Sequence, residues 1–486
     1  MNPGFEAVIG LEVHVQLRTR SKLFCACANA YGAPPNTLTC PVCLGLPGAL
    51  PVLNAEAVHQ ALVLGLALGA RIQSRSTFYR KQYFYPDLPK GYQITQGPLA
   101  LVEDGALTLP GDPGVRGGTG PVAVRVARAH LEEDAGKSSH DQRPGASLVD
   151  LNRAGVPLLE IVGAPELRSP QEASDYLKAL HRLVVFLGIC DGSLEEGSFR
   201  CDANLSLRRP GAEAFGTRVE VKNLNSFRFV KQALAFEMAR QAALLEAGRM
   251  VAQETRGWDA AAGETRPQRT KEAAMDYRFF PEPDLPPLEV TEAEVAAARA
   301  ALPELPEARL LRWQTEHGLG AEEALTLLQD PAFAAYFEAL AAASGSGKAA
   351  ATWMLGEVSR TLNERGGGLG AFPLAPETLA PLLRLVESRR ISFGTAKDQV
   401  FPALLAGEGD AEAFVAARGL AQVSDRGAVA ALVAQVLAAH PGPVAQYRAG
   451  KVALLGFLVG QVLKAGGGRV DPQVVNEVLA EALAKG

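Results

Sequence analysis

The sequence lacks the segments that insert a protein into a membrane or direct it out of the cell. It contains no apolar run of about 20 residues, the length that a membrane-spanning helix needs. Its first residues, Met1 to Glu6, do not form the basic and then apolar regions of a signal peptide. We therefore expect a cytoplasmic protein without a membrane span.

Cysteine is also scarce, with 6 residues in a chain of 486. Four of them lie within residues 25–43, whereas Cys190 and Cys201 stand alone. This distribution argues against a disulfide framework and suits a reducing compartment.

The four clustered cysteines form two pairs with the spacing of zinc ligands. Cys25 and Cys27 are followed, after twelve residues, by Cys40 and Cys43. Two thiol pairs separated by a short loop are typical of a structural zinc site. Four thiolates would fill the coordination sphere, so we expect this metal to take no part in catalysis. The alternative is a set of buried thiols without a metal.

An excess of positive charge is missing too, because the formal net charge is −5. The chain as a whole therefore has no electrostatic attraction for nucleic acid. The segment between Asp425 and Asp471 differs, since it contains no carboxylate. Its basic residues are Arg426, Arg448, Lys451, Lys464 and Arg469. Such a segment could contact a phosphate backbone, although its composition equally fits a lightly charged helical domain.

The length predicts several domains, because one hydrophobic core rarely serves so long a chain. Up to about residue 290, short alternating strands mix with a few helices, which predicts an α+β domain. The expected strands are 6–17, 121–131, 147–152, 199–207 and 217–222, and the expected helices are 169–187 and 225–247.

A proline-rich segment, residues 280–287, marks the end of this first part, because proline removes backbone donors and fixes the chain. Beyond it the composition shifts to Ala, Leu and Glu with helical spacing. A second break near residues 407–409 leaves a small helical tail, so we predict three domains.

Charged side chains alternate with apolar ones along several of the expected strands. Glu12 and His14 share one strand face, about 7 Å apart at the backbone. Further polar faces or positions occur at His130 to Asp134, Glu160, Arg200 to Asn204 and Arg218 to Lys222. One such face is usually just solvated, but several in one domain indicate a polar cleft that binds Mg²⁺ and phosphates.

Basic and aromatic residues interleave in the stretch Tyr79 to Gln93. Cations of this kind can hold phosphates while ring faces stack on bases. The same pattern would also fit a loop that packs its rings on the core.

Long blocks of the sequence resemble a known family, the GatB-type B subunits of tRNA-dependent amidotransferases. The resemblance spans essentially the whole chain. It rests on residues 8–14, 79–93, 130–137, 148–153, 195–204, 222–227 and 276–284. It implies a multidomain protein: a cradle-like α+β catalytic domain (1–292), an all-α helical domain (293–410) and a small all-α YqeY-like tail (411–486).

The resemblance also implies an activity. ATP would activate the side-chain carboxylate of Glu on tRNA(Gln) or Asp on tRNA(Asn) as an acyl-phosphate, and ammonia would then displace the phosphate. Ammonia would come from an amidase (A) subunit, with a small C subunit completing a heterotrimer. The non-discriminating aminoacyl-tRNA synthetase is a further candidate partner. The chain itself shows no convincing nucleophile for glutamine hydrolysis, which fits a subunit that receives its ammonia.

Roles carried over from the family give a set of expected site residues. The Mg²⁺ ligands are Glu12, His14, Glu133 and Glu160, with Glu132 in place of Glu133 if strand alternation continues unbroken. Lys81 and Arg200 would neutralise phosphate oxygens, and Asp202 would support the metal or the nucleotide. The tail residues Arg448, Lys451 and Lys464 would bind tRNA. Because the four cysteines are not universal in the family, zinc rests on their spacing alone.

A second hypothesis is a catalytically silent tRNA-binding scaffold. A pure RNA binder gains nothing from carboxylates gathered in one cleft, so the position of these acids separates the two hypotheses. The sequence does not decide between Glu-tRNA(Gln) and Asp-tRNA(Asn) as the substrate.

Overall fold

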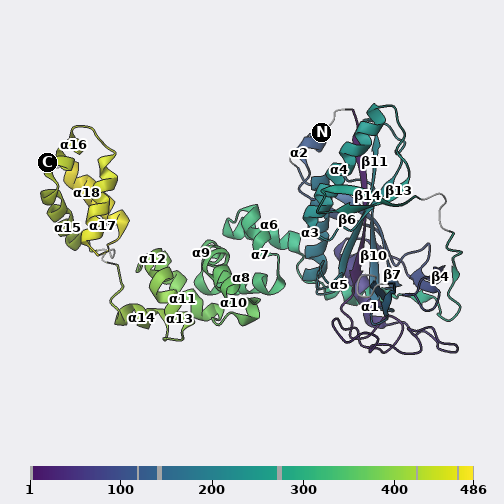
Figure 1. Ribbon diagram of the computed structural model, residues 1–486. Coiled ribbons are helices and arrows are strands. Elements are labelled where there is room, and N and C mark those ends of the chain that lie inside the picture. Colours follow the sequence, from purple (N-terminus) through teal and green to yellow (C-terminus); the bar gives the residue numbers. More distant parts are fainter. Residues whose placement is uncertain are drawn as a thin grey trace. The chain divides into compact units, whose positions relative to one another are not determined.

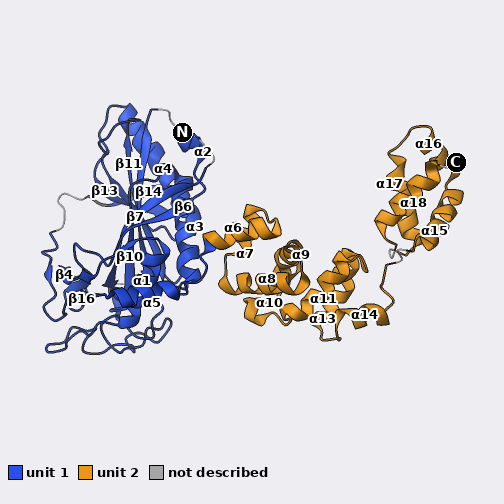
Figure 2. Ribbon diagram, turned by 180° about the vertical axis from the view of Figure 1, so that it is seen from behind, with its two compact units in different colours: residues 1–306 blue, residues 307–486 orange. Residues whose placement is uncertain are grey.

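The computed structural model describes residues 4–117, 120–139, 145–270, 276–422, 425–467 and 470–484. The chain divides into two compact units, Met1–Pro306 and Glu307–Gly486 (Figure 2). The first combines a mixed sheet with helices, and the regular elements of the second are helices. The predicted change from an α+β to an all-α composition is therefore confirmed.

A single large sheet organises the first unit, with twelve strands among its described residues (Figure 1). Its centre consists of four antiparallel strands in the order β11 (Phe199–Arg208), β1 (Glu6–Gln16), β10 (Pro157–Gly163) and β7 (Val122–Glu133). Next to β11 follow β12 (Val219–Lys222), β13 (Glu254–Asp259) and β14 (Glu264–Thr270).

Beyond β7 the sheet continues with β5 (Tyr92–Gln96), β4 (Phe78–Gln82) and, at the edge, β15 (Phe280–Pro281). The strand β6 (Val102–Leu109) pairs with β7 and with β2 (Arg71–Ile72). Two short ribbons stand apart: β3 (Arg75–Ser76) with β16 (Leu288–Glu289), and β8 (Lys137–Ser139) with β9 (Leu148–Asp150).

The predicted strands correspond to β1, β7, β9, β11 and β12, with ends that differ by at most two residues. Alternation explains this agreement for β1. Leu11, Val13 and Val15 are fully buried, whereas the polar residues between them remain partly accessible. A strand with one apolar and one polar face is therefore readable directly from the sequence.

Helices cover the apolar face of the sheet. The helix α3 (Pro170–Phe186) packs on α4 (Phe227–Glu246), which in turn contacts β11, and α1 (Ala55–Ala67) contacts β6 and β7 (Figure 1). The predicted helices 169–187 and 225–247 are thus confirmed as α3 and α4. Ser169 caps α3 by accepting from the backbone N–H of Glu172, as its sequence indicates.

The second unit consists of short helices. These are α6 (Pro306–His317), α7 (Ala321–Leu327), α8 (Pro331–Ser344), α9 (Gly347–Trp353), α10 (Ser359–Arg365), α11 (Pro376–Glu387), α12 (Phe393–Thr395), α13 (Phe401–Leu405) and α14 (Ala411–Ala417), with π-helical turns at Met354–Val358 and Ala396–Val400 and a 3₁₀ turn at Leu369–Ala371. The last four helices are α15 (Arg426–Ala439), α16 (Pro441–Arg448), α17 (Leu454–Ala465) and α18 (Pro472–Ala484), and they share a core around Val433, Leu458 and Leu479.

The boundary between the two compact units differs from the expected domain boundaries. The helix α5 (Glu292–Ala300) packs on α1, and the first unit extends to Pro306, beyond the expected boundary at residue 292. The helix α14 packs on α11, although the expected boundary at residue 410 would separate them. The three-domain division itself stays a prediction.

Among the described residues, no single helix combines the length and the apolar character needed to cross a membrane. Within this described part of the chain, only α15 and α16 taken together have suitable length and composition, and the two are bent by 95° relative to each other.

Candidate active site

The central strands place a row of polar side chains on the face of the sheet opposite the helices. In the observed register His14 lies opposite Glu160 of β10 and Arg200 of β11, and Glu160 lies opposite His130 of β7. Facing residues of antiparallel strands project from the same face. The register therefore gathers residues from four strands that are far apart in the sequence.

Two histidines and two carboxylates form the centre of this row, which we call the acid–histidine cluster: His14, His130, Glu132 and Glu160. His14 Nε2 lies 3.8 Å from Glu132 Oε1 and 3.9 Å from Glu160 Oε2. His130 Nε2 lies 3.1 Å from the same oxygen of Glu160 and 3.8 Å from Glu132 Oε2. One ligand atom each of His14, Glu132 and Glu160 lies within 4.8 Å of the other two.

The two carboxylates of the cluster have opposite pKa shifts. Burial raises the pKa of Glu132, and the neighbouring charge of Glu160 raises it further. Burial also acts to raise the pKa of Glu160, but the hydrogen bond and charge of His130, with the charges of His14 and Lys81, lower it to about 2. Glu132 therefore holds its proton to a higher pH than Glu160 does.

The donor set suits a divalent cation. Carboxylate oxygens are the protein ligands that Mg²⁺ prefers, and an imidazole nitrogen extends the range to other divalent metals. A bound cation would also favour the ionised form of both carboxylates. The residues present therefore fit a metal ion held between β1, β7 and β10.

The expected ligand Glu133 does not join this cluster. Its side chain lies on the other face of β7, where it accepts from the backbone N–H of Ile94 at 2.8 Å and forms an ion pair with Lys90. The β7–β10 register is regular here and shifts only between Val162 and Gly163. Because no bulge intervenes, alternation places Glu132 on the cluster side and Glu133 on the opposite face, the arrangement expected if Glu132 takes the place of Glu133.

The expected ligand Glu12 lies one position further along the same face of β1. It is opposite Asp202 of β11, and its Oε1 accepts from Asn204 Nδ2 at 2.9 Å. Glu12 is therefore adjacent to the cluster but is not among its three potential ligands. Asp202 forms an ion pair with Lys222 Nζ at 2.6 Å.

Lys81 and Arg200 provide positive charge on two sides of the cluster. Lys81 is a charged neighbour of both Glu132 and Glu160, and its ammonium lies 5.0 Å from the ring centre of Tyr277. Arg200 lies opposite His14 and donates to Asp134 Oδ2 at 2.8 Å. Gln16 Nε2 donates to the same oxygen at 2.8 Å.

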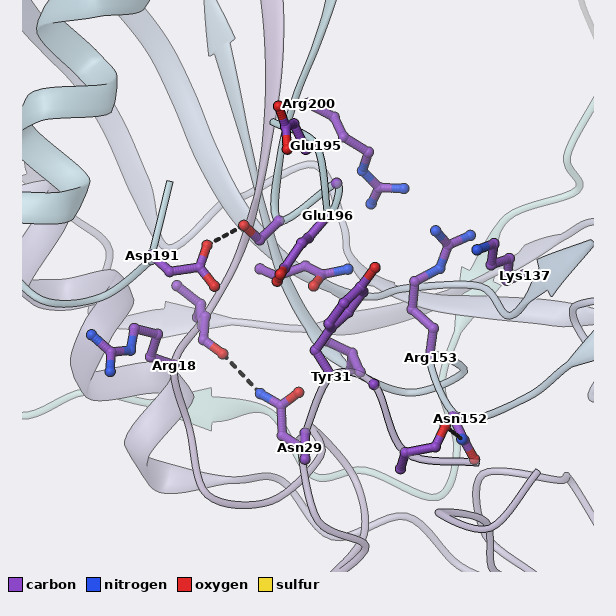
Figure 3. A pocket seen from close by; sticks show the side chains of 18 of the residues that line it. Arg18, Asn29, Tyr31, Lys137, Asn152, Arg153, Asp191, Glu195, Glu196 and Arg200 are labelled. Atoms are coloured by element: carbon purple, nitrogen blue, oxygen red, sulfur yellow. Dashed lines mark hydrogen bonds between the residues drawn. The ribbon is translucent and has the colours of Figure 1, made fainter. Parts of the chain in front are cut away.

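Beside Arg200 and Gln16 lies a pocket of about 830 Å³. Figure 3 shows Arg153, Lys137 and Arg200 on one side of it, and Arg18 and Asp191 on the other. Its volume is in the range of small-molecule and cofactor sites. Its arginine and lysine side chains could contact an anionic ligand, while the adjoining cluster could hold a metal.

Gln16 was not singled out from the sequence, and His130 and Asp134 were named only as part of a polar stretch, without individual roles. His130 is two positions from Glu132, and Gln16 is two positions from His14, so strand alternation places both on the cluster face. That spacing was the available signal. Asp134 follows the end of β7, and only the fold reveals that it lies beside Arg200.

The four expected zinc ligands do come together. One sulfur each of Cys25, Cys27, Cys40 and Cys43 lies within 4.8 Å of the others. The hydrogen bond from Cys25 lowers the pKa of Cys43 to about 4, and the positive charge of Lys22 acts in the same direction. Burial raises the pKa of Cys27 to about 11. Four converging sulfurs of this kind fit a structural zinc ion.

The expected tRNA-binding residues of the tail are exposed but do not form one cluster. Arg448 ends α16 and Lys451 precedes α17, whereas Lys464 is in the last turn of α17, roughly 15 Å along the helix from its start. Arg426 pairs with Glu477 and Glu481 of α18. Arg469 lies outside the described residues.

Two family models match the chain. The model described as the GatB/GatE catalytic domain matches residues 7–296, and the one described as the GatB domain matches residues 335–483. These matches cover most of the first unit and most of the second.

Similar proteins from several bacteria match over nearly their whole length. The proteins from Anaeromyxobacter sp. (strain K) and Syntrophotalea carbinolica are 53% and 50% identical over 484 and 483 residues, which is 99% of each chain. The protein from Myxococcus xanthus is 51% identical over 479 residues, 99% of this chain and 98% of its own. All three are named as the B subunit of an aspartyl/glutamyl-tRNA(Asn/Gln) amidotransferase.

Proposed function

Because the chain belongs to the family of B subunits of the aspartyl/glutamyl-tRNA(Asn/Gln) amidotransferase, we propose that it activates and amidates Glu on tRNA(Gln), Asp on tRNA(Asn), or both. The observation that carries this proposal is the acid–histidine cluster, placed on one sheet face between Lys81 and Arg200. Such a face provides what phosphoryl transfer needs, namely fixed positive charge and a site for a divalent cation.

The reaction takes place in two steps. A side-chain carboxylate oxygen of the tRNA-bound amino acid attacks the γ-phosphorus of ATP; an O–P bond forms, and the bond to the ADP oxygen breaks. Ammonia then attacks the acyl carbon, the C–O bond to phosphate breaks, and the nitrogen loses a proton. The products are the amide, ADP and phosphate.

The residues on the polar face would divide the work as follows. Lys81 and Arg200 neutralise phosphoryl oxygens from two sides, because positioning and charge neutralisation supply most of the rate in such transfers. Asp202 and Glu12, facing each other on neighbouring strands, support the metal or the nucleotide. The pocket beside Arg200 is large enough for a nucleotide, and its arginines would face the phosphates.

His14, Glu132 and Glu160 would hold Mg²⁺, with Glu132 in place of Glu133. When bound, this ion would supply positive charge that offsets the charge of the transferred phosphoryl group. His130, hydrogen-bonded to Glu160, fixes the orientation of that carboxylate.

The other expected features complete this function. The cysteine cluster would bind a structural Zn²⁺ and hold the loop between residues 25 and 43. The tail, with Arg448, Lys451 and Lys464, would contact phosphates along the tRNA body without reading sequence. An amidase (A) subunit would deliver ammonia, a small C subunit would complete a heterotrimer, and the non-discriminating synthetase would supply misacylated tRNA in the cytoplasm.

Replacing one acid of the cluster tests the proposal. We expect Glu160→Gln to reduce ATP consumption on misacylated tRNA by at least about 100-fold in the assembled amidotransferase, because metal ligands and their charge are lost together. The measurement is ADP release with Glu-tRNA(Gln) and with Asp-tRNA(Asn), which also determines the substrate. Glu213→Gln is the matched control, since Glu213 is an exposed carboxylate between β11 and β12.

Unchanged ADP release by the Glu160→Gln enzyme would refute a catalytic role for the cluster. It would leave the scaffold hypothesis, in which the chain binds tRNA and another subunit performs the chemistry.

A further inference from the structure

Several large rings near the acid–histidine cluster are exposed. Phe84 is 81% exposed, Tyr85 54%, Phe279 53% and Phe280 41%, in a chain of which only 6% is aromatic. Two of them, Tyr85 and Phe279, belong to a chain of touching rings that we call the aromatic platform: Tyr83, Tyr85, Tyr277 and Phe279. Exposed apolar side chains that contact one another mark interaction sites.

The platform combines two segments that are far apart in the sequence. The edge strand β15 pairs with β4, with Phe280 opposite Arg80, and the N–H of Gln82 donates to the carbonyl of Tyr277 at 3.0 Å. The rings of Tyr83 and Tyr85 are stacked, 4.7 Å apart with 7° between their planes. Tyr83 also contacts Tyr277, at 6.5 Å between ring centres.

A buried ion pair holds the two segments together. Arg80 donates to both carboxylate oxygens of Glu282 at 2.7 Å, and the Glu282 side chain is fully buried. The guanidinium also lies 4.3 Å from the ring centre of Tyr92 and 5.7 Å from that of Phe280. The platform is thus fixed in place before any ligand arrives, which reduces the entropy cost of binding.

The platform reaches the cluster through Lys81. The ammonium of Lys81 lies 5.0 Å from the ring centre of Tyr277. The same ammonium is close enough to influence both Glu132 and Glu160. A ligand that stacks on the platform would therefore end beside the reacting groups.

We infer that the aromatic platform stacks the unpaired 3′-terminal bases of the aminoacyl-tRNA and so positions the amino acid at the cluster. Exposed rings interleaved with lysine and arginine are how proteins bind single-stranded nucleic acid. Four contacting rings on two segments exceed what one adenine ring can cover, which favours a run of bases over the base of ATP. The cations among the rings disfavour an apolar protein interface, whose centre is depleted in charge.

This inference rests on the proposed function and is tested by comparing two forms of one tRNA. The assembled amidotransferase is titrated with uncharged tRNA(Gln), either intact or lacking its last three nucleotides. We expect the Phe279→Ala complex to bind intact tRNA about tenfold more weakly than the native complex, and to bind trimmed tRNA equally well. Phe279→Tyr keeps a ring and should restore the affinity.

The exposure of Phe279 makes its replacement harmless to folding, and the control is another exposed ring. Phe215 is 61% exposed in the same unit, so Phe215→Ala should leave both affinities within twofold of the native values. The KM for ATP should also stay within twofold in the Phe279→Ala complex.

Three results would overturn the inference. An equal loss for intact and trimmed tRNA would place the platform away from the 3′ end. A raised KM for ATP with unchanged tRNA affinity would assign the platform to the adenine base. Loss of co-elution with the partner subunits would make it a protein interface. A native complex that releases no ADP on misacylated tRNA would instead refute the proposed function, while leaving the comparison of tRNA affinities valid.

Discussion

At the scale of the residue, Lys22 couples the cysteine cluster to the rest of the first unit. It is fully buried and donates to the carbonyls of Leu38 and Ala154, at 2.8 and 2.7 Å. Its charge also favours the thiolate of Cys43, and a zinc ion with four thiolates carries a net negative charge. We expect Lys22→Met to lower the free energy of unfolding by about 2–3 kcal/mol, because buried carbonyls lose their donor. Zinc content should fall below the roughly one ion per chain expected for the native protein.

Urea unfolding and elemental analysis measure these two effects. Lys178→Met is the control, because the Lys178 side chain is 51% exposed, and its unfolding free energy should change by less than about 0.5 kcal/mol. A Lys22→Met protein with the zinc content and the urea unfolding midpoint of the native protein would contradict this role of Lys22.

At the scale of the element, Glu172 anchors the start of α3. Its buried carboxylate accepts from Arg116 Nε at 2.8 Å and from the backbone N–H of Arg168 at 2.9 Å. Burial acts to raise the pKa of Glu172, but the hydrogen bonds from Arg116 and Arg168 outweigh it and lower the pKa below its ordinary 4.5. The stabilisation that this carboxylate provides is therefore fully present above pH 4.5. It is lost as the pH falls through the lower pKa that Glu172 has in the folded protein. We expect Glu172→Gln to lower the free energy of unfolding by about 1–2 kcal/mol at neutral pH, with a smaller difference in acid.

Urea titrations of both proteins from pH 7 downwards measure this difference, with Glu213→Gln as the exposed control. A difference that grew in acid would show that the carboxylate is not stabilised by its partners.

At the scale of the whole molecule, the tail helices α15 to α18 have a core of their own, separate from the sheet. Since α14 packs on α11, a truncation after Gln422 removes the tail with fewer lost contacts than one at residue 410. We expect the truncated chain to bind tRNA more weakly than the full-length chain, by a factor of up to about ten, because a few phosphate contacts are lost. Its first unit should unfold at the same urea concentration as in the full-length chain.

Filter binding with tRNA(Gln) at two salt concentrations measures this loss of affinity, which should be larger at the lower salt concentration. Equal affinities of the full-length and truncated chains would refute a role of the tail in tRNA binding.

The elements of this protein are largely encoded in its local sequence. The strands β1, β7 and β11 follow from the alternation of apolar and polar residues, and α3 follows from Ser169 and Pro170 at its start. The four cysteines likewise indicate their own association by spacing. Each of these signals lies within one short stretch of chain, so neighbouring residues suffice to read it.

The candidate site depends on tertiary structure, because β1 lies more than a hundred positions before the strands β7, β10 and β11 that complete it. The sequence alone establishes that Glu12 and His14 share a face, and that Glu160 interrupts an apolar run. The register of β1, β7 and β10 was needed to show that Glu132 rather than Glu133 joins His14 and Glu160. Likewise, the pairing of β15 with β4 was needed to bring Tyr277 to Lys81. The physical reason is that alternation assigns a residue to a face of its own strand, whereas strand pairing determines which faces meet.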